Sequence, residues 1–191
     1  MDDARALDAQ VQTLDPLAPV SRIESLAIES LAGTPERKLE SALQFQRVVP
    51  EFAFYRLLCG MGLVNLGRRN EAQALLEAAP EEKIPSIAGR QCVFMGHALS
   101  GNRDAALNSI RESLKSAARR VEWWALVMAE CYALVDEKEQ ALDWLASAID
   151  HGFTNYPYLS QHDKMLAQFH GDPGFEVLMQ RAKNEWERFN A

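Results

Sequence analysis

The chain has 191 residues, of which 48% are hydrophobic and 25% are charged, so it is long enough for one domain with a buried core. Its net charge of −7 argues against a surface that binds nucleic-acid phosphates and against docking on anionic lipid. No apolar run reaches the length of a membrane span, and the first residues lack the apolar region of a signal peptide, so we expect a cytoplasmic protein.

The first stretch with helical spacing covers residues 4–14 and ends before Asp15-Pro16, because a residue that precedes proline avoids the α region. It has the form of the second helix of a repeat without the first. Residues 1–18 are therefore either the remnant of an earlier repeat, in a chain that is the C-terminal part of a longer protein, or an N-terminal cap. We favour the remnant.

Residues 19–151 contain a series of helical patterns that alternate with short turn signals. Most patterns place apolar residues on one helical face, although 52–66 is nearly apolar on all sides, and glycine or proline lies between most successive patterns. The expected helices form four pairs, at 19–32 with 35–49, 52–66 with 69–79, 86–99 with 103–118, and 121–135 with 137–150.

A six-residue segment recurs between the two helices of a pair. Gly67–Ala72 is repeated at Gly101–Ala106 and, more loosely, at Asp136–Ala141. The spacing is 34 residues from Ala72 to Ala106 and 35 from Ala106 to Ala141. A period in this range, with two helices in each unit, predicts a helical solenoid.

Residues 152–191 depart from this period. Gly152-Phe153 ends the last paired helix, an irregular stretch follows, and residues 163–169 have room for about two helical turns. Asp172-Pro173 then combines an N-cap residue with a proline in the first turn. The apolar stripe of this final helix predicts a C-terminal cap over the last pair; it comprises Phe175, Leu178, Met179, Ala182, Trp186 and Phe189.

Small residues stand where the paired helices would cross, at Gly60, Ala72, Ala106 and Ala141. Small side chains let two helix axes approach closely. With this spacing, the chain resembles the tetratricopeptide-repeat (TPR) family. The resemblance implies an all-α fold, a right-handed superhelix of about four helix pairs with a C-terminal capping helix.

The chain departs from the family pattern at three places. Lys38 replaces the small residue of the first pair, Phe94 stands where Gly60 would recur, and Asp136 replaces the turn glycine. The segment from Gly152 to Leu178 is similar to the end of TPR segments in bacterial signalling proteins, where those segments follow winged-helix, cyclase or kinase domains.

In this architecture the first helix of each pair lines the concave surface. The residues expected there form an apolar groove, namely Phe54, Leu57, Met61, Gln91, Met95, Trp123 and Leu126. The groove interpretation requires solvent-accessible side chains at Phe54, Met61, Met95 and Trp123. The alternative is that these residues are core, and that the C-terminal helix covers them.

These features favour a non-enzymatic interaction module that binds a peptide or a helix in the concave groove. The alternative is a regulatory or oligomerising C-terminal segment of a larger bacterial signalling or transcription-regulatory protein, which would form homodimers or higher species in solution. Both interpretations expect a protein partner rather than a nucleic acid or a membrane.

The remaining polar candidates carry less information. Arg111, Lys115 and Arg119 recur at helical spacing, and we favour a solvated face over a basic strip for an acidic partner. The three cysteines lie in apolar runs, and the four histidines lack the spacing of a zinc site. We therefore expect no metal, no cofactor and no catalytic site.

Overall fold

The computed structural model describes residues 2–14, 25, 28–29, 34–46, 53–78 and 86–189. Every regular element in these ranges is a helix, which confirms the all-α class. The helix expected at 19–32 lies outside the described residues apart from Ser25, Ile28 and Glu29. The helix ends expected at Pro50 and Pro80 also lie outside them.

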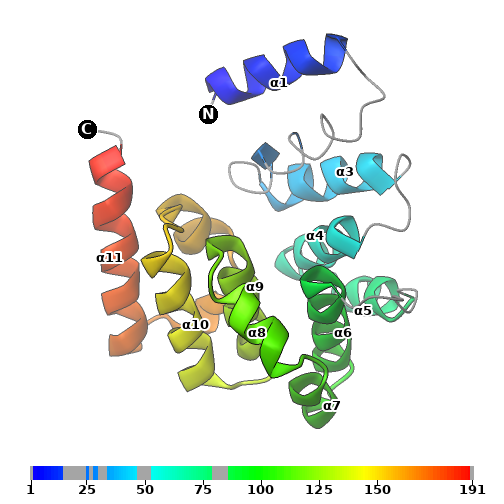
Figure 1. Cartoon of the computed structure of the whole chain (residues 1–191), viewed down its shortest axis with the longest axis vertical. Helices are drawn as coiled ribbons and strands as arrows, with labels where there is room; N and C mark the ends of the chain where they lie inside the picture. The colour runs from blue at the N-terminus through cyan, green and yellow to red at the C-terminus, as the bar shows by residue number, and fades with distance from the viewer. Residues whose placement is uncertain are drawn as a thin grey trace.

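The α-helices follow in chain order, and most of them lie where the sequence predicts a helix (Figure 1). They are α1 (Asp2–Leu14), α3 (Pro35–Gln46), α4 (Ala53–Asn65), α5 (Arg69–Glu77), α6 (Ile87–Leu99), α7 (Arg103–Asn108), α8 (Glu112–Ala118), α9 (Glu122–Ala133), α10 (Lys138–Asp150) and α11 (Pro173–Phe189). Between α10 and α11 lie a π-helical turn at Tyr158–His162 and a 3-10 turn at Leu166–Phe169.

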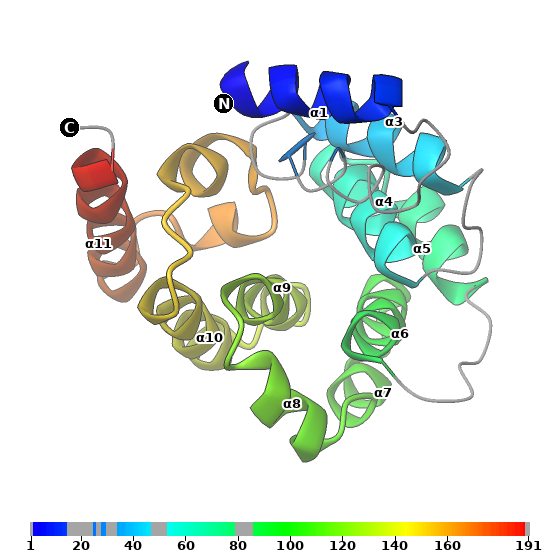
Figure 2. The same ribbon diagram turned by 45° about the horizontal axis from the view of Figure 1, so that its top comes forward.

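Helices that are neighbours in sequence are also neighbours in space. Successive contacts join α3 to α4, α4 to α5, α5 to α6 and α6 to α7, and α9 packs along α10, whose other side carries α11. Contacts of α6 with α4 and with α9 connect one pair to the next. Figure 2 shows the helices from α3 to α10 following an arc, with the segment between α10 and α11 on its inner side.

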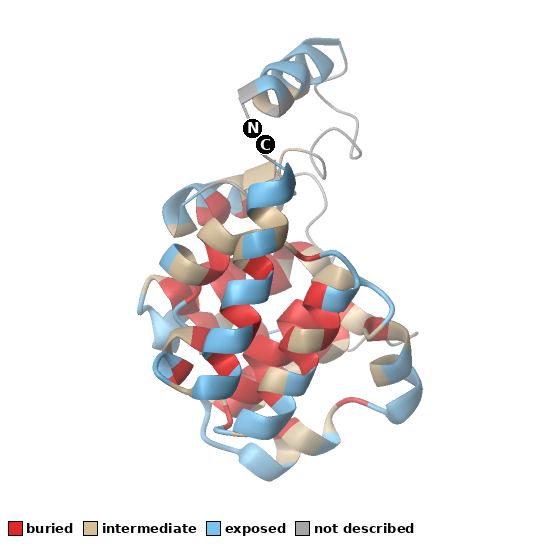
Figure 3. Ribbon diagram, turned by 90° about the vertical axis from the view of Figure 1, so that its left-hand side faces the viewer, coloured by how far each residue is buried: buried red, intermediate tan, exposed pale blue. Residues whose placement is uncertain are grey.

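Burial follows the apolar patterns of the sequence. Every residue of α4 from Leu57 to Asn65 is buried, as is every residue of α9 from Ala125 to Ala133. Figure 3 shows the buried residues gathered in the centre, with exposed residues on the outer helices. The nearly uniform apolarity of these two helices in the sequence reflects their position between neighbours on both sides.

The recurring six-residue segments form one kind of turn. A residue with positive φ closes each helix, at Gly67, Gly101 and Asp136, with φ of 75°, 78° and 58°. The following amide donates to a carbonyl five residues back, from Arg68 to Leu63, from Asn102 to His97 and from Glu137 to Tyr132, at 2.8–3.0 Å. This bond satisfies a carbonyl that the helix end leaves open. Aspartate replaces glycine in the third turn because a short polar side chain tolerates the left-handed region.

The prediction of one continuous helix at 103–118 is wrong. The stretch 103–118 divides into α7 and α8, because Arg111 has an extended backbone with φ −76° and ψ 154°. Just before the break, the Ser109 hydroxyl donates to the carbonyl of Ala106 at 2.7 Å, and its amide donates to the same oxygen at 3.0 Å. A serine that bonds a nearby carbonyl competes with the helical ladder, which accounts for the interruption.

The close helix contact expected at Gly60 is present. A Cβ atom placed on Gly60 would lie 2.9 Å from Cδ2 of Leu76, a buried residue of α5. Within the described part of the chain, none of the helices combines the length and apolarity needed to cross a membrane.

Candidate functional site

The seven residues of the expected concave groove are mostly sealed. Leu57, Met61, Gln91, Met95 and Leu126 have no exposed surface, and only Phe54 and Trp123 are half-buried. The expectation that Met61 and Met95 are solvent-accessible is therefore wrong. Gln91 is held in the core by a hydrogen bond from its Nε2 to the carbonyl of Trp124 at 3.0 Å. These side chains are core, and no open groove lies along them in this conformation.

The segment between α10 and α11 accounts for part of this burial, since it lies on the inner side of the arc (Figure 2). The amide of Lys164 donates to Asn65 Oδ1 at the end of α4, at 2.9 Å. Gln168 Nε2 donates to the carbonyl of Ala133 at the end of α9, at 2.8 Å. The irregular tail, and not the C-terminal helix, thus joins α4 to α9.

The C-terminal helix has the capping position expected from its stripe. Phe175, Leu178, Met179 and Ala182 are buried, and α11 packs against α10. Figure 1 shows α11 on the far side of α10 from α9. Phe189, at the end of the stripe, remains 79% exposed.

A buried polar cluster connects the tail to two helices. Lys38 from α3, Glu130 from α9, and Tyr158 and Asp163 from the tail are each at most 3% exposed. Tyr158 Oη donates to Glu130 Oε1 at 2.9 Å, and Lys38 Nζ donates to Tyr158 Oη at 3.5 Å. Lys38 Nζ also lies 5.4 Å from the centre of the Trp123 ring, where the electron-rich face stabilises a cation.

Burial controls the protonation of this cluster. Desolvation raises the pKa of Glu130 well above its ordinary value, and the nearby Asp163 raises it further. Desolvation also raises the pKa of Asp163 to about 6, although the amides of Leu166 and Met165 bond its carboxylate and oppose the shift. The pKa of Lys38 is lowered, chiefly by desolvation, against the attraction of Glu130 and Asp163.

A single proton resolves the hydrogen bonding of the two acids. With both carboxyls ionised, Glu130 Oε2 and Asp163 Oδ2 have no donor. Burial raises the pKa of both acids and so favours their protonated forms, and one proton shared by the pair gives both oxygen atoms a partner. Lys38 interacts electrostatically with both acids, and a buried charge costs less when a charge of opposite sign is near it.

Two of the three residues of the basic strip contact other side chains of the same chain. Arg111 occupies the N-cap position of α8 without a capping side-chain hydrogen bond and is exposed, while Lys115 Nζ lies 3.9 Å from Glu112 Oε2. Arg119 pairs with Asp143 and lies over the Trp144 ring at 4.1 Å from its centre. The choice between a solvated face and a basic strip for an acidic partner stays a prediction.

The histidines and cysteines are distributed over several helices and the tail, and Cys92 and Cys131 are near enough to interact. His151 Nδ1 lies 2.8 Å from the carbonyl of Ser147, and His170 packs edge-on against Phe175. Among the residues that the structure describes, no group of His, Cys, Asp and Glu has the arrangement of a metal site. The three cysteines are buried thiols, and desolvation raises the pKa of Cys59 to about 12.

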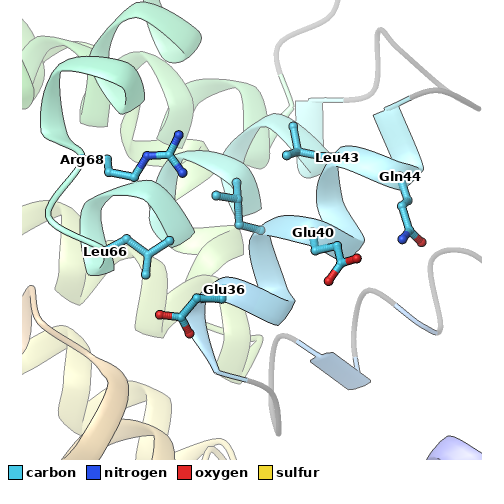
Figure 4. Close-up of a pocket in the computed structure, with 7 residues that line it drawn as sticks. Glu36, Glu40, Leu43, Gln44, Leu66 and Arg68 are labelled. Atoms are coloured by element: carbon cyan, nitrogen blue, oxygen red, sulfur yellow. The ribbon is translucent and has the colours of Figure 1, made fainter.

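An open apolar pocket lies instead on α3, at the N-terminal end of the array. Its volume is about 440 Å³, and it lies between α3 and the turn from α4 to α5 (Figure 4). Its floor is made of leucines, with Leu39 buried, Leu66 half-buried and Leu43 46% exposed. The polar residues of its rim are Glu36, Glu40, Gln44 and Arg68.

Five of the seven lining residues come from one face of α3, at positions 36, 39, 40, 43 and 44. This spacing is that of a single helical stripe. We call this surface the α3 groove. The sequence shows Leu39 and Leu43 as the apolar face of a helix, but the pattern alone does not distinguish a covered face from an open one.

The charges of the α3 groove are not balanced. Arg68 donates two hydrogen bonds to Glu71, at 2.8 and 2.7 Å. Its charge is therefore paired with a carboxylate that does not line the groove. A hydrogen bond from the Thr34 hydroxyl lowers the pKa of Glu36. Neither Glu36 nor Glu40 forms an ion pair with another described residue.

Comparison of the chain with protein families, with curated proteins and with solved structures finds no match.

Proposed function

We propose that the chain is a non-enzymatic protein–protein interaction module, built as a TPR-like helical array, that binds a partner helix in the α3 groove. The observation that carries the proposal is the open pocket of about 440 Å³ with a leucine floor. A helix laid in a hydrophobic groove is a common recognition mode, with anchors at helical spacing.

The state of the titratable groups supports binding rather than catalysis. The most perturbed side chains, Lys38, Glu130, Tyr158 and Asp163, are sealed in the core, so a substrate does not reach them in this conformation. Perturbed pKa values also arise in structural clusters, and this cluster has a structural role because it fixes the tail to α3 and α9.

The proposal is tested with a model helical peptide that has a leucine face and neutral glutamine on its other positions. Fluorescence anisotropy of the labelled peptide should show binding to the full chain. Because burial of a leucine stabilises by about 1.5–3 kcal/mol and Leu43 has about half its surface to bury, Leu43→Gln should weaken binding by about fivefold.

The control is Val177→Gln on α11, where an apolar side chain that is 60% exposed lies on another helix. It should leave the affinity unchanged. Absence of binding at peptide concentrations up to the millimolar range would refute the proposed function, as would an equal loss of affinity in both variants.

A second candidate is a regulatory or oligomerising segment of a larger bacterial signalling protein. It is favoured by the stripe of α1, where Leu7, Val11 and Leu14 are exposed at helical spacing, Leu14 by 86%. Two such helices would cover each other in a homodimer.

Light scattering at high protein concentration should then give twice the chain mass, and Leu7→Glu with Leu14→Glu should restore the monomer. A wild-type chain that stays monomeric would refute this candidate.

A further inference from the structure

The α3 groove presents carboxylates and leucines in a fixed order along one helical face. Glu36 and Glu40 are four residues apart, so they lie on the same side of α3 with a rise of about 6 Å between them. Leu39 and Leu43 repeat this spacing beside them. A partner helix that covers the leucines therefore brings its own flanking side chains against the two carboxylates (Figure 4).

We infer that the partner is a basic amphipathic helix, whose apolar side chains cover Leu43 and Leu66 and whose lysine or arginine side chains pair with Glu36 and Glu40. This inference rests on the proposed function. It adds the charge of the partner, which the apolar floor alone does not determine. The net charge of −7 also favours the approach of a cation over that of an anion.

A second copy of the chain fits the groove less well. The exposed stripe of α1 has the required leucines, but α1 also carries Asp2, Asp3 and Asp8, and its one cation, Arg5, pairs with Glu29 at 2.9 Å. Docking α1 in the groove would place acidic residues against Glu36 and Glu40, and like charges at close range are unfavourable.

The basic residues around α8 are also poor occupants. Arg119 is held by Asp143 and by the Trp144 ring, and α8 itself has only seven residues. A partner outside this chain, with cations free to pair, satisfies both the apolar floor and the acidic rim.

The test compares two model helical peptides with identical leucine faces, one with lysine and one with glutamine at the flanking positions. Both are titrated into the full chain at low salt. Two exposed ion pairs should make the lysine peptide bind about fivefold more tightly than the glutamine peptide. The preference should fall steeply as salt is raised, because exposed charges are screened.

Glu36→Gln with Glu40→Gln should remove the preference and leave the affinity for the glutamine peptide unchanged. The control, Glu112→Gln with Glu139→Gln, removes the same charge from α8 and α10, where both residues are exposed, and should keep the preference. Glu36→Lys with Glu40→Lys should reverse it. Thermal melts verify that each variant is folded.

The outcomes separate the two claims. Equal binding of both peptides to the wild-type chain would overturn the basic partner and leave the proposed helix-binding function standing. A lysine preference that persists in the Glu36 and Glu40 variant would also overturn it, since the attraction would then come from the overall charge. If neither peptide binds, the proposed function fails and this inference fails with it.

Discussion

Replacement of Gly60 by alanine measures how closely α4 and α5 approach. The added methyl would lie 2.9, 3.1 and 3.1 Å from Cδ2, Cδ1 and Cγ of Leu76, whereas carbon atoms pack at about 3.5–4.0 Å. Leu76 is only 2% exposed, so it has little room to turn away. Overpacking of this kind costs about 1–3 kcal/mol.

Gly96→Ala is the matched control, because Gly96 faces the same leucine from α6. Its methyl would lie 3.6 Å from Cβ of Leu76 and 3.8 Å from Glu77, which are ordinary contacts. In both variants the free energy of unfolding gains about 0.8–1 kcal/mol, because alanine has a higher helix propensity than glycine. This gain cancels in the comparison, so Gly60→Ala should be about 1–3 kcal/mol less stable than Gly96→Ala.

Urea unfolding followed by circular dichroism measures both free energies of unfolding. In a Leu76→Ala background, which itself costs about 2–5 kcal/mol, the clash at Gly60 is absent. Gly60→Ala should then stabilise the protein, and the double-mutant cycle should give a coupling energy of about 1–3 kcal/mol. Equal effects at Gly60 and Gly96, or no coupling with Leu76, would refute the close approach of α4 and α5.

Three other predictions concern buried and capping groups. Lys38→Met should lower the free energy of unfolding by about 3–5 kcal/mol, because it leaves the buried Asp163 without its cation; a loss below about 1 kcal/mol would contradict the pairing. Cys59 should resist a thiol reagent at pH 8 in the native chain and react fully in denaturant, since its pKa is raised to about 12; rapid native labelling would show that the site is open. Asp172→Asn should lower the Tm at pH 7, where the carboxylate caps α11 and bonds Lys138 at 2.8 Å. Because these bonds lower the pKa of Asp172, the stabilisation is present above its unfolded pKa and is lost as pH falls through the lower folded value. The Tm values of wild type and variant should therefore converge at a pH below the ordinary aspartate pKa of about 3.9, and a difference independent of pH would contradict the assignment.

The sequence predicts most of the helices because their signals are local. Gly67 and Gly101 mark the turns, and the apolar periods on either side place α4, α6, α9 and α10 within a few residues of their ends. Small residues such as Gly60 also indicate correctly where two helices meet. Each of these features depends on residues that are near one another in the chain.

Features that depend on distant residues are missed. Lys38 stands out in the sequence only as a departure from the small residue of a repeat, whereas the structure buries it beside Glu130, 92 residues away in the chain. One signal was available, since Glu130 is an isolated charge within the apolar run of α9. Two opposite charges in otherwise apolar helical faces suggest a buried pair, but the sequence does not say that they meet.

The candidate site in the structure differs from the one that the sequence predicts for the same reason. The apolar residues of α4, α6 and α9 could line a groove or form a core. Met61 and Met95 are buried, so these residues belong to the core. What covers the inner face is the irregular tail, which carries no periodicity from which its path could be predicted. The α3 groove is open because no described segment lies over Leu43, and the pattern of α3 itself is the same in either case.

The most direct test of the account is the hydrogen-exchange footprint of the lysine-flanked peptide on the full chain. Binding in the α3 groove predicts slower exchange in residues 36–46 and in the turn at 63–68, with no change in α9 or in the tail at 158–169. Protection centred on α9, or faster exchange in the tail as the peptide displaces it, would place the binding surface on the inner face and contradict the account.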